Sequence, residues 1–456
     1  MWGRHRQWGA ASVKRDQTPK GGTRVVGTRK AIITAVLLTV VGFNLRAVIL
    51  GVPPVLPLIR QDLALSYTAI GLLTSLPVLV MGGFAWPAGL LAGRVGARTM
   101  VLVGLALLAA GALLRAVAPG AAPLFFFTFA LSLGIALAQT AAPVLTRQWF
   151  PTRIGLVSAL FSDGLIVGES VAAGVTVPIM RRFFGADAWQ ATFVVWSVPV
   201  LLAAALWALL APAAPATRAR PAVAGGASSE PALTPSPTDT PARPRVSALH
   251  LGILLGCGSL VYFGMNGWIA NYNRALRLDD ITPVALSTLN AAQLPVSFAV
   301  TIFAQRLAGR RWPFIAAGTV CVLSMTGWVL TPHALEPLWA GLLGGASACV
   351  FVLGLALPPL LAGPGEVARL TGLTLTISYS VAFVGPLVGG SLWDTFGQPI
   401  LAFLPVATAG CLLIILGVLL PARAAFGLLG DLEHAIERGD VGDRSEHGAA
   451  ATRAGG

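Results

Sequence analysis

Long apolar segments alternate with short polar ones along almost the whole chain. Each apolar segment has about 20 residues or more, the length that an α-helix needs to cross a bilayer, whereas a barrel strand needs about half as many. The pattern therefore predicts an all-α membrane protein with twelve transmembrane helices. The predicted helices cover residues 31–58, 67–92, 99–118, 122–148, 154–180, 189–211, 247–271, 282–307, 312–331, 336–361, 368–392 and 398–421.

Three polar stretches flank or interrupt this pattern. They are a basic tail at 1–30, a central stretch at 212–246 and a tail at 422–456. The central stretch holds eight prolines in 35 residues, so it has too little apolar surface to fold and is predicted to be a flexible linker. The sequence thus predicts two pseudo-symmetric six-helix bundles, over 31–211 and 247–421.

The composition excludes several classes of protein. Of the 456 residues, 55% are hydrophobic and only 11% are charged, whereas a soluble domain carries about 25% charged residues. A soluble enzyme and a secreted disulfide scaffold are therefore excluded. The net charge of +13 comes from basic residues at segment ends and in the tails, so the expected partner is the lipid bilayer and not nucleic acid. The four cysteines lie in apolar segments without metal-ligand spacing and are expected to be buried hydrophobes.

The distribution of lysine and arginine predicts the orientation. Of the 31 basic residues, 24 are assigned to the tails and to loops on their side, and six to loops on the other side. Because basic residues collect on the cytoplasmic side, both termini and the linker are predicted to be cytoplasmic and the chain to lie in the inner membrane. The first apolar segment is expected to be retained, since the stretch before it is too long and too polar for the start of a secretory signal.

The two halves resemble each other. Residues 92–98 have an echo in residues 304–310 at an offset of 212, and Pro77 matches Pro295 at an offset of 218. Together with the central linker, these matches indicate a duplication of six helices. No phosphate-binding loop, nucleophile elbow or zinc-protease motif occurs, so no cofactor or metal is expected and a membrane enzyme is disfavoured. Two repeated halves without an ATPase are typical of secondary transporters, which bind substrate near the midplane between the halves.

The segment after the second predicted helix carries a family signature. It reads Gly89-Leu-Leu-Ala-Gly93-Arg94-Val-Gly96-Ala-Arg98 and resembles the G-x-x-x-D-R-x-G-x-[RK] loop of the major facilitator superfamily. The resemblance implies that superfamily's fold and a gating role for Gly89, Arg94, Gly96 and Arg98. Gly93 stands where the family has the aspartate that helps to latch the two halves together on the cytoplasmic side. A basic turn that follows the positive-inside rule would explain the two arginines equally well.

A narrower resemblance covers most of both halves and points to the cyanate and 2-nitroimidazole transporter family. The resemblance departs from the family after the seventh-helix tryptophan, where Ala270 and Asn271 replace expected prolines, and in the fifth helix, where Asp163 and Glu169 replace expected small apolar residues. The matching runs are Asn44-Leu-Arg46, Leu76–Gly83, Ala112–Arg115, Gly134-Ile135 with Gln139 and Pro143, and Asn266-Gly-Trp268.

Arg46 is the only basic residue assigned to the interior of a predicted helix. A helix rises about 1.5 Å per residue, which places Arg46 about 22 Å along the first helix, and Asp163 and Glu169 about 14 Å and 22 Å along the fifth. Arg46 and Glu169 thus share a depth, and the resemblance implies that their helices are neighbours. Two interpretations stay open. In the first, Arg46 and Glu169 form a permanent pair that neutralises two buried charges. In the second, Arg46 binds an anionic substrate, and one of the two carboxylates, Asp163 or Glu169, exchanges a proton.

Other residues are weaker candidates for the substrate site. Asn44 lies about 200° around the helix from the arginine, so the two share a cavity only if the helix is distorted. Gln139 needs a partner inside the membrane, either in a cavity or on a neighbouring helix. Asn266, Trp268 and Tyr379 offer contacts from the second half, although such residues are more often packing residues.

These observations favour a secondary transporter of the inner membrane. The expected substrate is a small polar or anionic solute, such as a cyanate-like anion or a nitroimidazole-like heterocycle. The protein is expected to be a monomer that moves this solute by alternating access. Proton coupling through Asp163 or Glu169 is a hypothesis. A drug or metabolite exporter of the same fold is one alternative, and a membrane sensor that binds solute without moving it is another.

Overall fold

The structure is a computed structural model, and all regular secondary structure in the residues that it describes is helical. The predicted tail 422–456, nearly all of the predicted tail 1–30 and nearly all of the predicted linker 212–246 lie outside those residues. The described ranges are 28–117, 120–150, 152–185, 188–212, 247–303, 307, 310–361 and 367–420.

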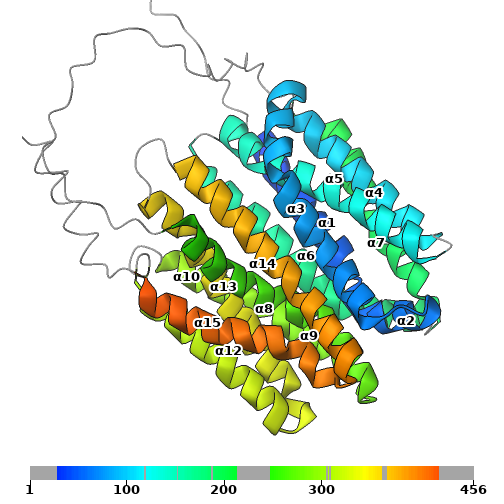
Figure 1. Cartoon of the computed structure of the whole chain (residues 1–456). Helices are drawn as coiled ribbons and strands as arrows, with labels where there is room; N and C mark the ends of the chain where they lie inside the picture. Colours follow the sequence, from blue (N-terminus) through cyan, green and yellow to red (C-terminus); the bar gives the residue numbers. More distant parts are fainter. Residues whose placement is uncertain are drawn as a thin grey trace, which may run out of the picture.

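The first half of the chain folds into six long helices and a short connecting pair (Figure 1). Several run beyond their predicted ends, since basic residues that flank the apolar core of a span continue the helix. The helices are α1 (Thr28–Leu50), η1 (Pro53–Val55), α2 (Leu56–Asp62), α3 (Tyr67–Val95), α4 (Ala97–Ala116), α5 (Ala121–Trp149), α6 (Ile154–Phe183) and α7 (Trp189–Leu210).

The second half also consists of long helices with short 3-10 helices between some of them, and one of its predicted helices is divided in two. The helices are α8 (Ala248–Ala275), α9 (Thr282–Ala291), α10 (Gln293–Ile302), α12 (Trp312–Leu330), η2 (His333–Leu335), α13 (Glu336–Leu361), α14 (Val367–Phe396), η3 (Pro399–Phe403) and α15 (Leu404–Leu419).

The predicted helix 282–307 is broken within the membrane. Its first part, α9, ends at Ala291, and its second part, α10, begins at Gln293. Pro295 has no N–H to donate to the carbonyl of Ala291 four residues earlier, which explains the interruption. Eleven other helical stretches among the described residues are long and apolar enough to span a membrane, so the count of twelve crossings agrees with the sequence prediction.

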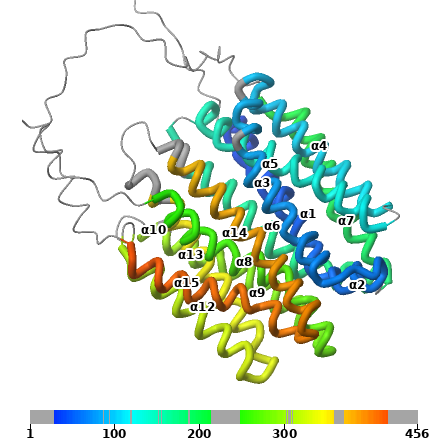
Figure 2. Tube along the Cα trace, viewed as in Figure 1, coloured from blue at the N-terminus to red at the C-terminus, as the bar shows by residue number. Residues whose placement is uncertain are grey.

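The long helices alternate in direction, so their ends gather on two sides. We call the side where α1 begins and α15 ends the terminal side, and the side where α1 ends and α3 begins the far side. The two halves lie side by side in Figure 1 and in the tube of Figure 2. They meet mainly along α3 against α14 and along α6 against α9.

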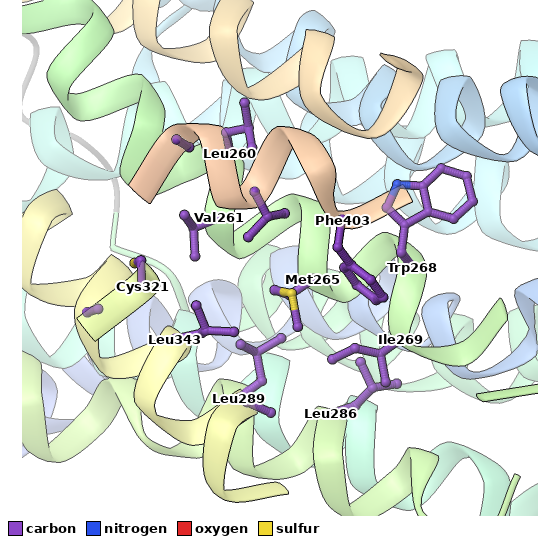
Figure 3. Packing of buried hydrophobic residues seen from close by; sticks show 14 of the residues in the cluster. Leu260, Val261, Met265, Trp268, Ile269, Leu286, Leu289, Cys321, Leu343 and Phe403 are labelled. Carbon is purple, nitrogen blue, oxygen red and sulfur yellow. The ribbon is translucent and has the colours of Figure 1, made fainter. Parts of the chain in front are cut away.

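Large apolar side chains fill the interior of each half. In the second half, α8 is the central helix, and 22 of its 28 residues are buried. Figure 3 shows how its side chains interlock with those of the surrounding helices. The labelled residues are Leu260, Val261, Met265, Trp268 and Ile269 of α8, Leu286 and Leu289 of α9, Cys321 of α12, Leu343 of α13 and Phe403 of η3.

Candidate functional site

Helices α1 and α6 approach each other closely because glycines line their contact. A Cβ added at Gly168 on α6 would overlap the backbone carbonyl of Phe43 on α1, and one added at Gly42 on α1 would overlap the backbone of α6. Small residues allow backbones in a membrane to come this close. The close contact holds Arg46 of α1 beside Glu169 of α6.

Arg46 and Glu169 form a buried ion pair. Arg46 Nε lies 3.3 Å from Glu169 Oε1, and the two side chains are 10% and 5% exposed. Arg46 Nε and Nη1 are both buried without a hydrogen-bond partner, so the contact with Glu169 is an ion pair without hydrogen-bond geometry. Arg46 Cζ lies 5.9 Å from the centre of the Phe263 ring on α8. Donors of the guanidinium therefore stay available to another acceptor.

Gln293 connects this pair to the second half. It is the first residue of α10, directly after the break, and its Nε2 donates to Glu169 Oε2 at 3.3 Å. A row of three side chains, Arg46, Glu169 and Gln293, thus runs from α1 through α6 to the broken helix. Any movement that separates the halves at this level has to break the Glu169–Gln293 hydrogen bond.

A second polar group surrounds Asn266 in the second half. The Tyr262 hydroxyl donates to Asn290 Oδ1 at 2.8 Å, and Asn290 Nδ2 donates to Asn266 Oδ1 at 3.0 Å. Asn266 Nδ2 in turn donates to the Tyr262 carbonyl at 3.0 Å. The Asn266 amide is thus held by the Asn290 side chain and by the Tyr262 backbone carbonyl, which together fix its position.

Arg115 is a second buried cation, so the expectation that Arg46 is the only basic residue inside a span is wrong. Arg115 lies in the last turn of α4 and is 3% exposed. Its Cζ lies 4.2 Å from the centre of the Phe193 ring, and its Nε and Nη2 have no hydrogen-bond partner. It lines a cavity of about 30 Å³ that also touches Asn266 and Phe263.

Among the described residues, the remaining polar candidates of the first half form no hydrogen bond with the ion pair. Asn44 is buried, but its Nδ2 donates to the carbonyl of Val40 on its own helix at 2.8 Å. Gln139 on α5 is half-buried, and its Oε1 has no partner. Gln139 Oε1 and Asn44 Oδ1 are therefore both available to accept a hydrogen bond from a solute.

The aromatic candidates of the second half sit in packed surroundings. Trp268 is fully buried within the apolar cluster of Figure 3, with its ring 5.9 Å from that of Trp393. Tyr379 on α14 is 9% exposed, and its ring lies against Gly82 of α3. Tyr379 thus helps to join the halves, and Trp268 contributes to the core.

Asp163 and Glu169 have opposite environments on the same helix. Asp163 is exposed, and the described part of the chain provides it with no hydrogen-bond or ion-pair partner. Glu169 is the carboxylate that the structure brings together with Arg46.

The predicted gating loop is mostly helical. α3 continues to Val95, so Gly89 and Arg94 lie on its exposed surface. Gly96 joins α3 to α4 with φ of 85°, a conformation that glycine adopts without strain. Arg98 Nη2 donates to the carbonyl of Ala208 at the end of α7 at 3.2 Å, so Arg98 here connects helices within one half.

The described contacts between the halves gather at mid-membrane and on the far side. Asp394, near the end of α14, accepts from the backbone N–H groups of Tyr67 at 2.9 Å and of Thr68 at 2.7 Å, the first residues of α3. The Tyr67 ring also stacks on Trp393 at 3.7 Å between centroids. A carboxylate at a helix N-terminus accepts from free N–H groups and complements the helix dipole. Asp394 therefore holds the two halves together on the far side.

Replacing Asp394 with alanine should loosen this closure. Loss of a helix cap costs about 1 kcal/mol, so a cysteine introduced at Thr74 should react about fivefold faster with an impermeant maleimide applied from the far side. Ser391→Ala is the matched control, because Ser391 bonds only within its own helix. Equal labelling rates in the Asp394 and Ser391 variants would contradict the assignment.

Three of these residues were not candidates from the sequence. Gln293 is an amide two residues before Pro295 in an apolar segment, and this pattern was a usable signal. Arg115 falls inside the predicted helix 99–118, but its position near the end of that helix did not distinguish it from the basic residues that flank a span. Asp394 had no local signal, because its partner Thr68 is 326 residues away in the chain.

Proteins of similar sequence are transporters. The chain is 28% identical over 366 residues to the uncharacterized transporter YycB of Bacillus subtilis (strain 168), covering 80% of this chain and 86% of that protein. It is 28% identical over 393 residues to the cyanate transport protein CynX of Escherichia coli (strain K12), with 83% and 95% covered. It is 25% identical over 399 residues to the 2-nitroimidazole transporter of the same organism, with 87% and 97% covered.

The fold also matches solved transporters. A bacterial homolog of the human lysosomal transporter Spinster, in an inward-facing and unoccupied conformation, superposes with a TM-score of 0.62 at 14% identity, covering 89% of this chain and 97% of that chain. The sequence model of the Major Facilitator Superfamily matches residues 32–386. The predicted fold is confirmed, and the chain is a multi-pass membrane transport protein and not an enzyme. It belongs to the Major Facilitator Superfamily.

Proposed function

We propose that this transporter carries a small anionic or polar solute, such as a cyanate-like anion or a nitroimidazole-like heterocycle. Its relatives named for cyanate and for 2-nitroimidazole support a solute of this size. The unpartnered Nη1 of Arg46 supports an anionic or electron-rich one, since a guanidinium with a free donor binds a planar acceptor. Asn44, Gln139, Asn266 and Tyr379 are further candidates for contact with the solute.

The row from Arg46 through Glu169 to Gln293 is the observation that carries this proposal. A solute anion that binds Arg46 competes with Glu169, and a carboxylate released from its partner takes up a proton more readily. The same carboxylate holds Gln293 of the other half. One set of contacts therefore links the binding of solute to the protonation of Glu169 and to the separation of the halves at this level. Asp163 is a second candidate proton carrier.

Flux through the reconstituted protein tests the proposal. Proteoliposomes holding the full chain are supplied with labelled cyanate or 2-nitroimidazole, with and without an imposed pH gradient. We expect saturable uptake of at least one of the two solutes. A pH gradient of one polarity should make this uptake faster than it is without a gradient. Movement only of bulky amphiphiles would favour the exporter, and saturable binding without any flux would favour the sensor.

The proposed orientation places the terminal side in the cytoplasm. Because 24 of the 31 basic residues are assigned to that side, tags at both termini and at position 230 should be protected in intact cells. A tag in the loop after α4 should instead be accessible from outside. Labelling of position 230 in intact cells would overturn the orientation.

A further inference from the structure

Arg115 is a buried charge without a counter-charge. Among the described residues, four charged side chains are buried: Arg46, Arg115, Glu169 and Glu336. Arg46 faces Glu169, and Glu336 accepts a contact from His333 at 2.8 Å. No carboxylate of the described part of the chain lies within ion-pair distance of Arg115, so its burial is uncompensated.

The contact with Phe193 compensates for this only in part. The ring face lies 4.2 Å from Arg115 Cζ and attracts the cation, but it accepts no conventional hydrogen bond. Nε and Nη2 therefore remain buried donors without acceptors. Buried donors of this kind usually meet an acceptor, and a charged donor loses the most when it has none.

A small cavity provides the space for such an acceptor. Arg115 lines it together with Thr74 of α3, Thr128 of α5, and Phe263 and Asn266 of α8. Its volume of about 30 Å³ has room for about two water molecules, because one water needs roughly 10–15 Å³ by the same measure. A ligand of two to four heavy atoms fits this space, and an aromatic anion does not.

The cavity lies on the far-side flank of the central ion pair. It touches Ile49 and Leu50, the last turn of α1, about one turn beyond Arg46. Phe263 lines the cavity, and Arg46 Cζ lies 5.9 Å from the centre of its ring, so this residue adjoins both the cavity and Arg46. Both halves contribute to the wall, through α1, α3, α4 and α5 on one side and α8 on the other.

We infer that the Arg115 cavity is a second anion-binding subsite, which takes a small monoanion of carboxylate or linear triatomic size. An anion in this cavity supplies the negative counter-charge that Arg115 lacks. It lies between the two halves, toward the far side, where Asp394 joins them. It therefore stabilises the far-side-closed conformation and offers a solute anion a second position beyond Arg46. The second of these roles rests on the proposed function, whereas the binding itself does not.

Thermal unfolding of the full chain in detergent tests this subsite with formate and nitrate as probes. Gluconate keeps the ionic strength constant, because it is too large for the cavity. We expect each probe to raise the Tm of the wild type with saturation. Arg115→Gln should weaken the apparent affinity on the order of 30-fold, in line with the loss of one partner of a buried charged contact. Benzoate should give no saturable shift.

The matched control is Arg182→Gln. Arg182 also lies over a phenylalanine ring, that of Phe183 at 6.0 Å, but it is exposed at the far end of α6. This variant should keep the wild-type anion response. Without anion, Arg115→Gln should have a Tm equal to or above that of the wild type, since it removes an unpaired buried charge. A lower Tm together with an unchanged anion response would show a packing role and overturn the inference.

A double variant, Arg46→Gln with Glu169→Gln, separates this inference from the proposed function. If the subsite is formed by Arg115, the double variant still responds to formate and nitrate even where it no longer transports. If the response disappears in the double variant and persists in Arg115→Gln, the anion binds at Arg46, and the inference fails while the proposed function stands. No response in the wild type would also overturn the subsite, and the flux measurements would still decide the proposed function.

Discussion

Arg46→Gln and Glu169→Gln should each lower stability and reduce solute flux at least about tenfold, and combining them should restore stability without restoring flux. Each single substitution leaves one buried charge unpaired, which costs about 3–5 kcal/mol. The pair is 10% and 5% exposed, so solvent does not relieve that cost. The double variant removes both charges and with them the destabilisation, but it also removes the donor and the carboxylate that the proposed transport cycle uses.

A double-mutant cycle measures this difference. Unfolding midpoints and uptake rates are recorded for the wild type, both single variants and the double variant, and the coupling is taken from each set separately. Coupling in stability with no recovery of flux supports a working site. Recovery of both would show that the pair only neutralises two charges, and the transport role of Arg46 would be abandoned.

Arg46→Lys adds a second criterion to the same cycle. Lysine keeps the charge, but its compact ammonium cannot reproduce the planar fork of donors, so solute affinity should fall while stability stays closer to that of the wild type. Wild-type affinity in this variant would instead assign Arg46 to charge balance. The control is Arg182→Gln, an exposed cation whose loss should leave both quantities unchanged.

Gly168→Ala should destabilise the protein by about 1–3 kcal/mol and impair transport, although the change adds a single methyl group. The new Cβ would overlap the Phe43 carbonyl, so α1 and α6 would have to move apart, and overpacking of a close contact costs energy of this order. The same movement would draw Arg46 away from Glu169. Thermal unfolding and uptake by the purified variant measure the two effects.

Gly83→Ala provides the matched comparison. Gly83 lies within the long helix α3, as Gly168 lies within α6. A Cβ added at Gly83, however, meets no atom within 4 Å. Alanine is favoured over glycine within a helix by about 1 kcal/mol, so this variant should be as stable as the wild type or more stable. If both alanine variants behave alike, close α1–α6 packing does not position the ion pair.

The sequence by itself was sufficient for the arrangement along the chain. A long apolar segment crosses a bilayer as an α-helix, because every backbone N–H and C=O group must then be hydrogen-bonded within its own segment. The twelve crossings followed from that constraint, whereas the duplication was indicated by the matches of residues 92–98 with 304–310 and of Pro77 with Pro295. The match in depth between Arg46 and Glu169 could also be read from the sequence, since the rise of a helix per residue is constant.

Only the tertiary structure decided which side chains face each other. In a membrane bundle both the lipid and the helix contacts are apolar, so the hydrophobic pattern gives little information on how each helix is rotated. Arg115 therefore appeared as one more basic residue near a helix end until the packing of α4 against Phe193 showed that it is buried. The contacts of Gln293 with Glu169 and of Asp394 with Thr68 depend on how two halves dock, and docking joins residues 124 and 326 positions apart that no local periodicity relates.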